Sequence, residues 1–283
     1  MATEPGSRSR VGGLVSAADD ALRGTGNRVL ATLPWLAPAL LVVRDAYARG
    51  YVAARATANA VRYDAPVAPY RLVRVDPADV EFANGSPVAK FRTAGAVVGG
   101  DWDRTDTRFA DTDVYRAYVR HFEEGVPWEE TAFYDRIVDE LAAGRERWGC
   151  HTEAEFRERC DRLDDLYDAI AERGYRSQEE LRASDESDPI REQPRLVTER
   201  LKHEIAVHFD RHGRPQFDDG RNRLSIAKLL DLDSVPVRVL RRHERWQAVR
   251  DAYVRGEEWA RDRGDHPDIR YLEFGSAGPS SGR

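Results

Sequence analysis

The sequence predicts a mixed α/β fold in which helices attach to a small sheet, and three observations support this prediction. Alternating, β-rich segments lie near position 70 and again between positions 204 and 240. Between about 112 and 173, apolar side chains instead recur every three or four positions, as in helices. With 41% hydrophobic residues, the chain of 283 can also bury a core.

The N-terminal part is predicted to form a basic helical arm. Residues 1–27 are rich in Gly, Ser and Arg, so we expect a disordered tail. Within the arm, residues 28–62, an amphipathic helix is predicted from Ala39 onward because seven apolar side chains share one face. These are Leu40, Val43, Tyr47, Tyr51, Ala54, Ala58 and Val61.

Two interpretations of this arm stay open. Its apolar face could lie on an anionic lipid surface, with Arg44, Arg55 and Arg62 beside it. The commoner alternative is a helix that packs on the body of the protein, and we favour it. The apolar stretch Val29–Val43 has 15 residues and two prolines, which is shorter than the ~20 residues that a membrane span needs.

The middle of the chain is predicted to begin with strands and continue as helices. Residues 70–82 read as a strand that runs into a turn at Asp76-Pro77, and 84–87 read as a second turn. A short strand is expected at 96–98. Helices are expected at about 112–123, from Pro127 to 143, and at 153–173, where Thr152 and Glu155 form a capping box. Ser177 and Glu180 repeat that signal before a short helix, and 183–195 read as a loop.

The last third returns to strands. Residues 204–209 and 216–218 are predicted to pair around a hairpin turn at 210–215, and Asp219 to Arg223 form a loop before a helix at 224–230. A strand at 234–240 and a helix at 241–263 follow, and 265–283 read as a tail.

Charge and cysteine content limit the class of protein. The chain has 50 acidic and 44 basic residues, a net charge of −6, which argues against a general polyanion binder. Residues 1–62 nevertheless carry eight arginines against four acids, so a DNA or membrane partner for the arm stays open, with DNA not favoured. Two cysteines are too few for a disulfide scaffold, and a cytoplasmic location, peripheral to a membrane at most, is expected.

The segment that points most directly to chemistry runs from Asp218 to Ser225. A helix that begins directly after a strand and a glycine directs free backbone N–H groups at an anion, and Gly220 lets a ligand come close. Arg221 and Arg223 add cationic donors, Asn222 can donate and accept, and Ser225 could donate to phosphate. The alternative is a capped helix whose arginines pair with neighbouring aspartates. We list the phosphate-binding residues as Asp219, Gly220, Arg221, Asn222, Arg223 and Ser225.

The string DDGRNRLSIAKLLDLDSVPVRVL resembles the signature of the ParB/sulfiredoxin-like fold, in which a Gly-x-x-Arg loop opens a helix and an Ile-Pro-Val strand follows. The segments LVRVDPADV and LYDAIAERGYRSQ resemble the opening strand and an earlier helix of that family. The resemblance covers about a third of the chain. It implies a small mixed sheet over 70–242, with a helical insertion at about 100–150.

Members of this fold bind nucleotides, so the resemblance implies ATP, ADP or CTP with magnesium as ligand. Gly220 matches the loop glycine and Arg223 the arginine that contacts phosphate. Arg221 stands where sulfiredoxins have a catalytic cysteine and ParB proteins a glutamate, which makes both of those chemistries improbable. No helix-turn-helix for DNA follows the fold, so this chain resembles a branch that lacks the ParB DNA-binding region.

Four further residues are candidates for a base or a magnesium ligand. Asp101 and Asp103 follow two glycines, Glu81 follows the opening strand, and His243 follows the last strand. For each of them a structural or surface role is the commoner outcome. The cysteines and histidines fit no standard zinc spacing, so no metal site is assigned.

The function that follows from these observations is binding of a nucleotide or another phosphorylated ligand, with possible coupling to phosphotransfer. The alternative is an interaction module without catalysis, attached to DNA or to a membrane surface through residues 28–62. Whether the protein is an enzyme stays open, because one fold carries many activities.

Overall fold

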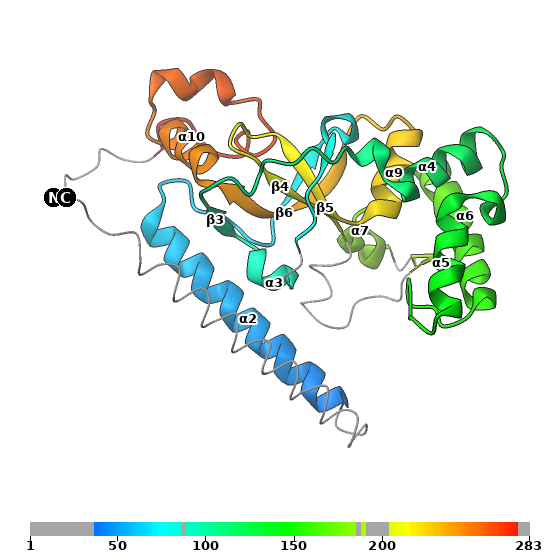
Figure 1. The fold of residues 1–283 in the computed structure, drawn as a ribbon. Coiled ribbons are helices and arrows are strands. Elements are labelled where there is room, and N and C mark those ends of the chain that lie inside the picture. The colour runs from blue at the N-terminus through cyan, green and yellow to red at the C-terminus, as the bar shows by residue number, and fades with distance from the viewer. Residues whose placement is uncertain (1–36, 87–88, 185–187, 191–203, 277–283) are drawn as a thin grey trace. The chain divides into compact units, whose positions relative to one another are not determined.

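The computed structural model describes residues 37–86, 89–184, 188–190 and 204–276, and Figure 1 shows the elements that they form. These residues divide into two compact units, one that ends at Ala48 and one that starts at Arg49. The fold belongs to the mixed α/β class that the sequence predicts. Predictions for residues 1–36 and for most of 183–195 fall outside the described ranges.

The described strands form one mixed sheet. They are β1 (Leu72–Val75), β2 (Phe82–Ala83), β3 (Ala96–Val98), β4 (Ile205–Phe209), β5 (Pro215–Asp219) and β6 (Val235–His243). Their order is β1-β6-β4-β5-β2, and β3 also pairs with β6. Strands β3 and β4 run parallel to β6, whereas β5 runs antiparallel to β4 and parallel to β2.

These directions give the sheet two chemically different ends. The carboxyl ends of β3, β4 and β6 meet at one end, which we call the Asp103 end after the loop that follows β3. The carboxyl ends of β2 and β5 meet at the opposite end, which we call the Gly220 end. In the β4–β5 pair, Phe209 faces Pro215 at the first end and Ala206 faces Asp219 at the second.

One face of the sheet packs against α9 (Arg221–Leu229) and α10 (Glu244–Val254) (Figure 1). Alternate residues of β4 and β6 point into this core, as the period of two in a strand requires. The strands and the two helices contribute the following buried residues to this core: Val73, Val75, Ile205, Val207, Phe209, Val235, Val237, Val239, Leu224, Ala227 and Trp246.

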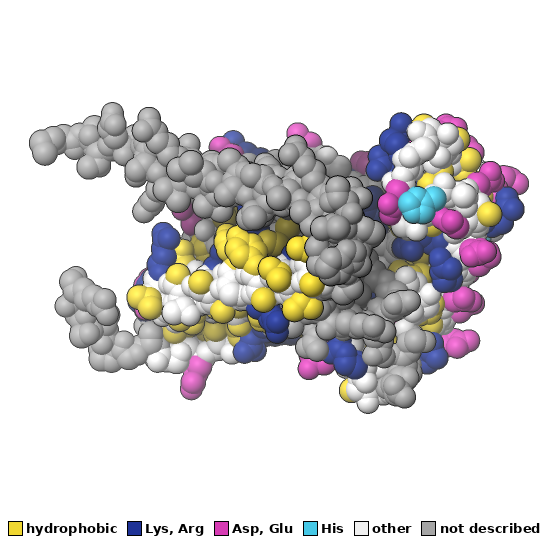
Figure 2. All heavy atoms as spheres, turned by 90° about the horizontal axis from the view of Figure 1, so that it is seen from below, with side chains coloured by type: hydrophobic (Ala, Val, Ile, Leu, Met, Phe, Trp, Pro, Cys, Tyr) yellow, Lys and Arg dark blue, Asp and Glu magenta, His cyan; other side chains and the backbone are white. Residues whose placement is uncertain are grey.

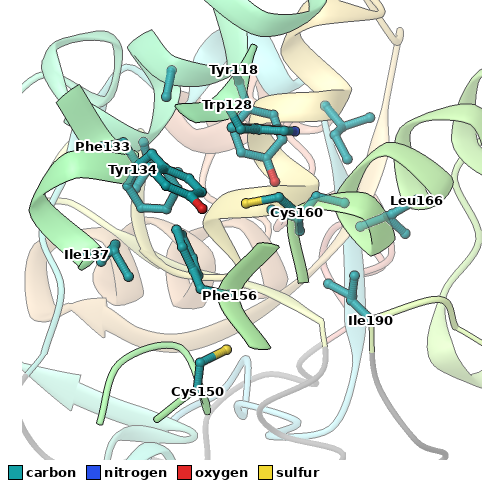
Figure 3. Close-up of a cluster of buried hydrophobic side chains, with 14 of the residues drawn as sticks. Tyr118, Trp128, Phe133, Tyr134, Ile137, Cys150, Phe156, Cys160, Leu166 and Ile190 are labelled. Atoms are coloured by element: carbon teal, nitrogen blue, oxygen red, sulfur yellow. The ribbon is translucent and has the colours of Figure 1, made fainter. Parts of the chain in front are cut away.

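A second core lies among α4 (Asp113–Tyr118), α5 (Ala132–Ala142) and α6 (Glu153–Arg173) (Figure 3). Each helix begins at a threonine whose hydroxyl accepts a backbone N–H, namely Thr112, Thr131 and Thr152. The sequence predicts α6 correctly, but α5 starts later than Pro127 because a 3-10 turn, Trp128–Glu130, precedes it. Cys150 and Cys160 are buried free thiols in this core.

Three other short helical stretches also precede β4. Helix α3 (Lys90–Thr93) precedes β3, and α4 continues as a π-helical turn, Val119–Glu123. Helix α7 (Gln178–Ala183) begins with the predicted capping box between Ser177 and Glu180.

The long helix α2 (Ala37–Arg62) forms as predicted, but the face predicted to be buried is exposed. Val43, Tyr47 and Val61 are 65%, 46% and 82% exposed, and Ala54 and Ala58 are exposed as well. In the part of α2 within the second unit, the inward side chains are instead Val52 and Asn59, with Arg55 half-buried.

Polar bonds to α3 and to the residues directly after it explain this orientation. Arg55 donates to the carbonyls of Arg92 and Ala94, and Asn59 Nδ2 donates to the Gly95 carbonyl over 2.7 Å. Arg55 is therefore held by its own chain and does not belong to a row of arginines free for lipid. This end of α2 follows the interpretation that the sequence favoured, a helix packed on the body.

The C-terminal elements also differ from the prediction. Strand β6 extends to His243, and α10 ends at Val254, before a 3-10 helix at Glu258–Arg263. Residues 265–276 are not a loose tail, because Asp268 is fully buried and accepts hydrogen bonds from Arg242 and Trp246 over 2.7 and 3.0 Å. These partners outweigh the effect of burial and lower the pKa of Asp268 to about 2.

Candidate functional site

The junction between β5 and α9 has the geometry that the sequence predicts for an anion site. Gly220 adopts φ 90° and ψ 33°, a left-handed conformation, and α9 starts at the next residue. A Cβ at Gly220 would lie 2.9 Å from the Ile205 Cα, so only glycine fits between the two backbones. Gly220, the N-cap residue, has no side chain, and no side chain of the described residues caps α9, which leaves the amides of its first turn directed at whatever lies beyond the glycine.

The residues after Gly220 are helical from the start, which corrects the predicted loop. Because successive residues of a helix are rotated by about 100°, the side chains of residues 221 to 225 point into different environments. Arg221 is exposed, whereas Asn222, Arg223 and Ser225 are buried, with exposed fractions of 8%, 4% and 0%.

Arg223, which the resemblance assigns to phosphate, forms a buried ion pair with Asp188. A phosphate could reach the Arg223 guanidinium only if Asp188 gave way. The predicted alternative, an arginine paired with an aspartate, therefore describes Arg223, although the partner is Asp188 and not a neighbour in sequence. Arg221 is the arginine of this segment whose charge faces solvent.

The ion pair belongs to a buried polar chain that sequence analysis missed. Asp188 Oδ2 accepts from Gln178 Nε2 over 2.8 Å, and the Gln178 amide donates to Glu204 Oε1 over 2.7 Å. Glu204 immediately precedes β4, and its carbonyl oxygen would lie 3.3 Å from a Cβ at Gly220. The chain therefore connects the first turn of α9 to the backbone next to Gly220. No sequence motif marks it, because its four members, at positions 178, 188, 204 and 223, come from separate segments.

Glu204 is the most perturbed acid at the Gly220 end. It is 3% exposed, and burial raises its pKa to about 7, although the Gln178 amide and Arg238 oppose that shift. Its Oε2 atom has no hydrogen-bond partner among the residues that the structure describes. A buried carboxyl group that titrates near neutral pH is typical of functional sites.

Two more buried polar groups lie on the first two turns of α9. Asn222 Oδ1 and Ser225 Oγ have no partner within the described ranges. Buried polar atoms are usually hydrogen-bonded, so each unpaired one indicates a group that a ligand or a water satisfies. The Asn222 amide can turn its oxygen or its nitrogen toward such a group.

The acids beside Gly220 are already engaged. Asp219 Oδ1 accepts the Gly220 amide over 2.9 Å, and Lys90 forms ion pairs with Asp218 and, at 3.6 Å, with Asp219. Asp218 also accepts from His208 Nε2 over 3.0 Å in a fully buried contact. Asp219, Gly220, Arg221, Asn222, Arg223 and Ser225 therefore lie together, as predicted, but in different roles.

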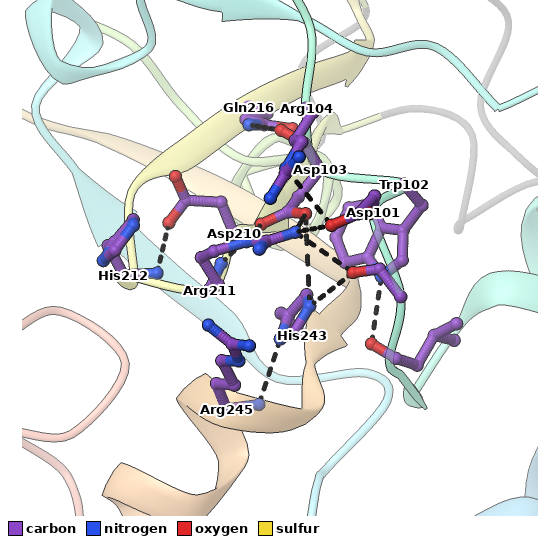
Figure 4. Close-up of polar contacts among 12 residues, drawn as sticks. Asp101, Trp102, Asp103, Arg104, Asp210, Arg211, His212, Gln216, His243 and Arg245 are labelled. Atoms are coloured by element: carbon purple, nitrogen blue, oxygen red, sulfur yellow. Dashed lines mark hydrogen bonds and ion pairs between the residues drawn. The ribbon is translucent and has the colours of Figure 1, made fainter.

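The other four candidate residues lie at the Asp103 end, so the structure does not bring them to Gly220 (Figure 4). Asp101 and Asp103 follow β3, His243 ends β6, and Glu81 precedes β2 at an exposed position. Asp101 and Asp103, the predicted magnesium ligands, follow β3, which ends at the opposite end of the sheet from β5 and Gly220. Glu81 and His243, the predicted bases, also lie at that opposite end.

Arg211 forms hydrogen bonds with both Asp101 and Asp103. Its backbone N–H, Nε and Nη2 donate to Asp103 over 2.9, 2.8 and 2.6 Å, and Nη2 also donates to Asp101 over 2.8 Å. These bonds hold the pKa of Asp103 far below its ordinary range. Within the described residues, no group of three or more His, Cys, Asp or Glu side chains is placed to hold a metal ion.

His243 uses both ring nitrogens in structural bonds. Nδ1 accepts the Arg245 amide over 3.0 Å and so caps α10, while Nε2 donates to the Gly100 carbonyl over 2.9 Å. With Nδ1 accepting and Nε2 donating, the ring has no free lone pair to take a proton from a substrate. Its role here is structural.

Comparison with known proteins gives no match: no family model, no curated protein and no solved structure is similar to this chain. The ParB/sulfiredoxin resemblance therefore rests on the residues quoted for it and stays a prediction.

Proposed function

We propose that the protein binds a phosphate-bearing ligand, of which ATP, ADP and CTP with magnesium are the leading candidates, at the N-terminus of α9. The observation that carries the proposal is the uncapped start of α9 behind a left-handed glycine that is packed on the Ile205 backbone. A helix dipole and free amides favour a phosphate there, and the glycine lets the turn before α9 pack against the Ile205 backbone.

The surrounding side chains support the same proposal. Arg221 offers a cation in the first turn, and the unpaired Asn222 and Ser225 side chains offer hydrogen bonds. Arg223 supports the site indirectly by fixing Asp188 and Gln178. We therefore expect direct phosphate contact from Arg221 and a positioning role for Arg223.

Binding is tested by calorimetry with ATP, ADP, CTP and inorganic phosphate, each with and without magnesium. Arg221→Gln should weaken binding about 10- to 100-fold, the range for one charge-assisted hydrogen bond. Ser225→Ala should weaken binding without loss of stability, because it removes a buried hydroxyl that has no partner. Arg270→Gln, another exposed arginine, is the matched control.

The outcome that contradicts the proposal is clear. The proposal of a phosphate site at α9 would be refuted if none of these ligands bound. It would also be refuted if the wild type, Arg221→Gln and Ser225→Ala bound them equally.

Transfer of the phosphoryl group is the second part of the proposal, with Glu204 as the proton acceptor. An acceptor oxygen bonds to the terminal phosphorus, the bond to the nucleoside diphosphate breaks, and the acceptor proton passes to the unpaired Glu204 Oε2. With water as acceptor, Glu204→Gln should lower hydrolysis of ATP or CTP about 100-fold while the Kd stays unchanged. Equal hydrolysis by both proteins would contradict this role.

A membrane-surface role for α2 is the second candidate, and the exposed apolar face of that helix favours it. Val43, Tyr47 and Val61, which share one face by the helical repeat, are 65%, 46% and 82% exposed, and Figure 2 shows exposed hydrophobic side chains on this helix. Exposed arginines at 44 and 62 could meet anionic headgroups. No helix of the described residues is long and apolar enough to cross a membrane.

This candidate is tested by sedimentation with phosphatidylserine vesicles. Val43→Glu with Val61→Glu should abolish co-sedimentation and leave the unfolding midpoint unchanged, since both side chains are exposed. High salt should weaken the wild-type interaction. Equal sedimentation of both proteins would refute a lipid contact through this face.

A further inference from the structure

A cavity of about 540 Å³ opens at the Asp103 end, remote in the sheet from α9, and its lining is rich in arginine. Arg104, Arg211, Arg214 and Arg245 contribute to the wall, together with His212. They come from the loop after β3, the β4–β5 turn and the start of α10, so three separate segments direct cations at one space (Figure 4).

Two of the three aspartates in the wall form ion pairs with arginines of the same wall. Asp103 and Asp210 side chains are 3% and 2% exposed, and they bind Arg211 and Arg214 respectively. Asp106, the third, is exposed. Arg104 and Arg211 in turn pair with Asp101, so Arg245 is the arginine of the wall that has no ion pair within the described residues.

The buried aspartates also hold the β4–β5 turn rigid. Asp210 Oδ1 accepts the amides of His212 and Arg214, both over 2.8 Å, and its Oδ2 accepts from Arg214 Nε over 2.8 Å. A Cβ at Gly213 would lie 2.7 Å from the Trp246 ring, so the turn sits directly on the core. Because the turn that carries Arg214 is fixed before binding, placing this guanidinium at a ligand costs little entropy.

Two cationic or titratable side chains remain available in this cavity. The Arg245 guanidinium and the His212 imidazole have no hydrogen-bond or ion-pair partner in the part of the chain that the structure describes. Figure 4 shows Arg245 pointing from α10 toward the β4–β5 turn. Arg214 is bound only through Nε and is 66% exposed, so its outer nitrogens are also open to a ligand.

We propose that this cavity is a second binding site, for a small anion that carries a phosphate or carboxylate group, held by Arg245, Arg214 and His212. An anion supplies the counter-charge that Arg245 lacks within the described residues, and a guanidinium fork matches either group. The neighbouring cavity of about 350 Å³ carries Asp79 and Glu81, which confines the anion to the arginine side. The site does not depend on the phosphate site at α9, because the two lie at opposite ends of the sheet.

The test is calorimetric titration of the full chain with inorganic phosphate and, separately, with succinate. Arg245→Gln should weaken binding about 10- to 100-fold and leave the unfolding midpoint unchanged, because its side chain has no described partner to lose. Arg221→Gln, which alters the α9 site, should leave succinate binding unchanged. Tighter binding of one probe identifies the anionic group that the cavity prefers.

The results that would overturn this second site differ from those that would refute the phosphate site at α9. Absence of binding by both probes would overturn it, as would binding that Arg245→Gln and Arg214→Gln leave unchanged. Phosphate binding that only Arg221→Gln weakens, together with no succinate binding, would place the anion at α9 and refute the second site.

Discussion

Replacing Glu204 by glutamine should make the protein more stable in alkaline solution than the wild type. Folding buries this carboxyl group and raises its pKa from the ordinary 4.5 to about 7. The folded protein therefore holds a proton that the unfolded chain releases at lower pH. Glutamine keeps an oxygen that can accept the Gln178 amide, so the substitution removes the charge and retains the hydrogen bond.

The magnitude follows from proton linkage. Between pH 4.5 and 7 the folded state binds one more proton than the unfolded state, so wild-type stability falls by about 1.4 kcal/mol per pH unit. The contribution is fully present below pH 4.5 and is lost as the pH rises through 7. Over the 2.5 units between the two values the loss is about 3 kcal/mol.

Urea unfolding of both proteins at a series of pH values from 4.5 to 8.5 measures this difference. Other titrating acids contribute alike to both proteins, so the difference between the two curves isolates Glu204. Arg238, which attracts the carboxylate, and Glu179 and Glu180, which repel it, belong to the environment of the group in both proteins. A difference that stays constant across this range would refute the raised pKa of Glu204.

Three further predictions concern packing and reactivity. Gly220→Ala should lower the free energy of unfolding, measured in urea, by more than about 2 kcal/mol. Gly144 also has a positive φ, but nothing lies near the place of its Cβ, so Gly144→Ala should lower that free energy by about 1 kcal/mol. Equal losses in the two variants would contradict the close approach of Gly220 to Ile205. Asp188→Asn should cost about 3 kcal/mol because it removes the carboxylate charge that faces the buried Arg223 guanidinium, and replacing both residues by apolar ones should restore much of that loss. An unchanged unfolding midpoint in Asp188→Asn would mean that the pair is not buried. Cys160, whose pKa burial raises to about 12, should react with a thiol reagent only as the protein unfolds, and fast labelling of the native protein would contradict its place in the core.

Much of the local structure could be predicted because it depends on short-range interactions. The capping residues Thr152 and Ser177 set the starts of α6 and α7, and both helices begin where the sequence indicates. The β4–β5 hairpin and the glycine before α9 follow from turn chemistry in the same way. The prediction failed for α2, where the apolar stripe is clear in sequence but polar bonds to α3 and to the residues directly after it decide which side faces inward.

The same contrast holds for the candidate sites. Residues 219–225 were found because one contiguous segment carries their pattern, whereas Gln178, Asp188 and Glu204 come from separate segments that meet only in the fold. Strand direction, which no local pattern reports, places Asp103 and His243 at the opposite end from Gly220.

The sequence alone thus determined the mixed α/β class, most helix and strand positions and the glycine at the start of α9, since these depend on neighbours along the chain. The tertiary structure alone decided which charges are buried, which arginines face solvent and where the cavities open. Burial and pairing depend on contacts between residues far apart in sequence, such as Arg223 with Asp188 and Arg211 with Asp103.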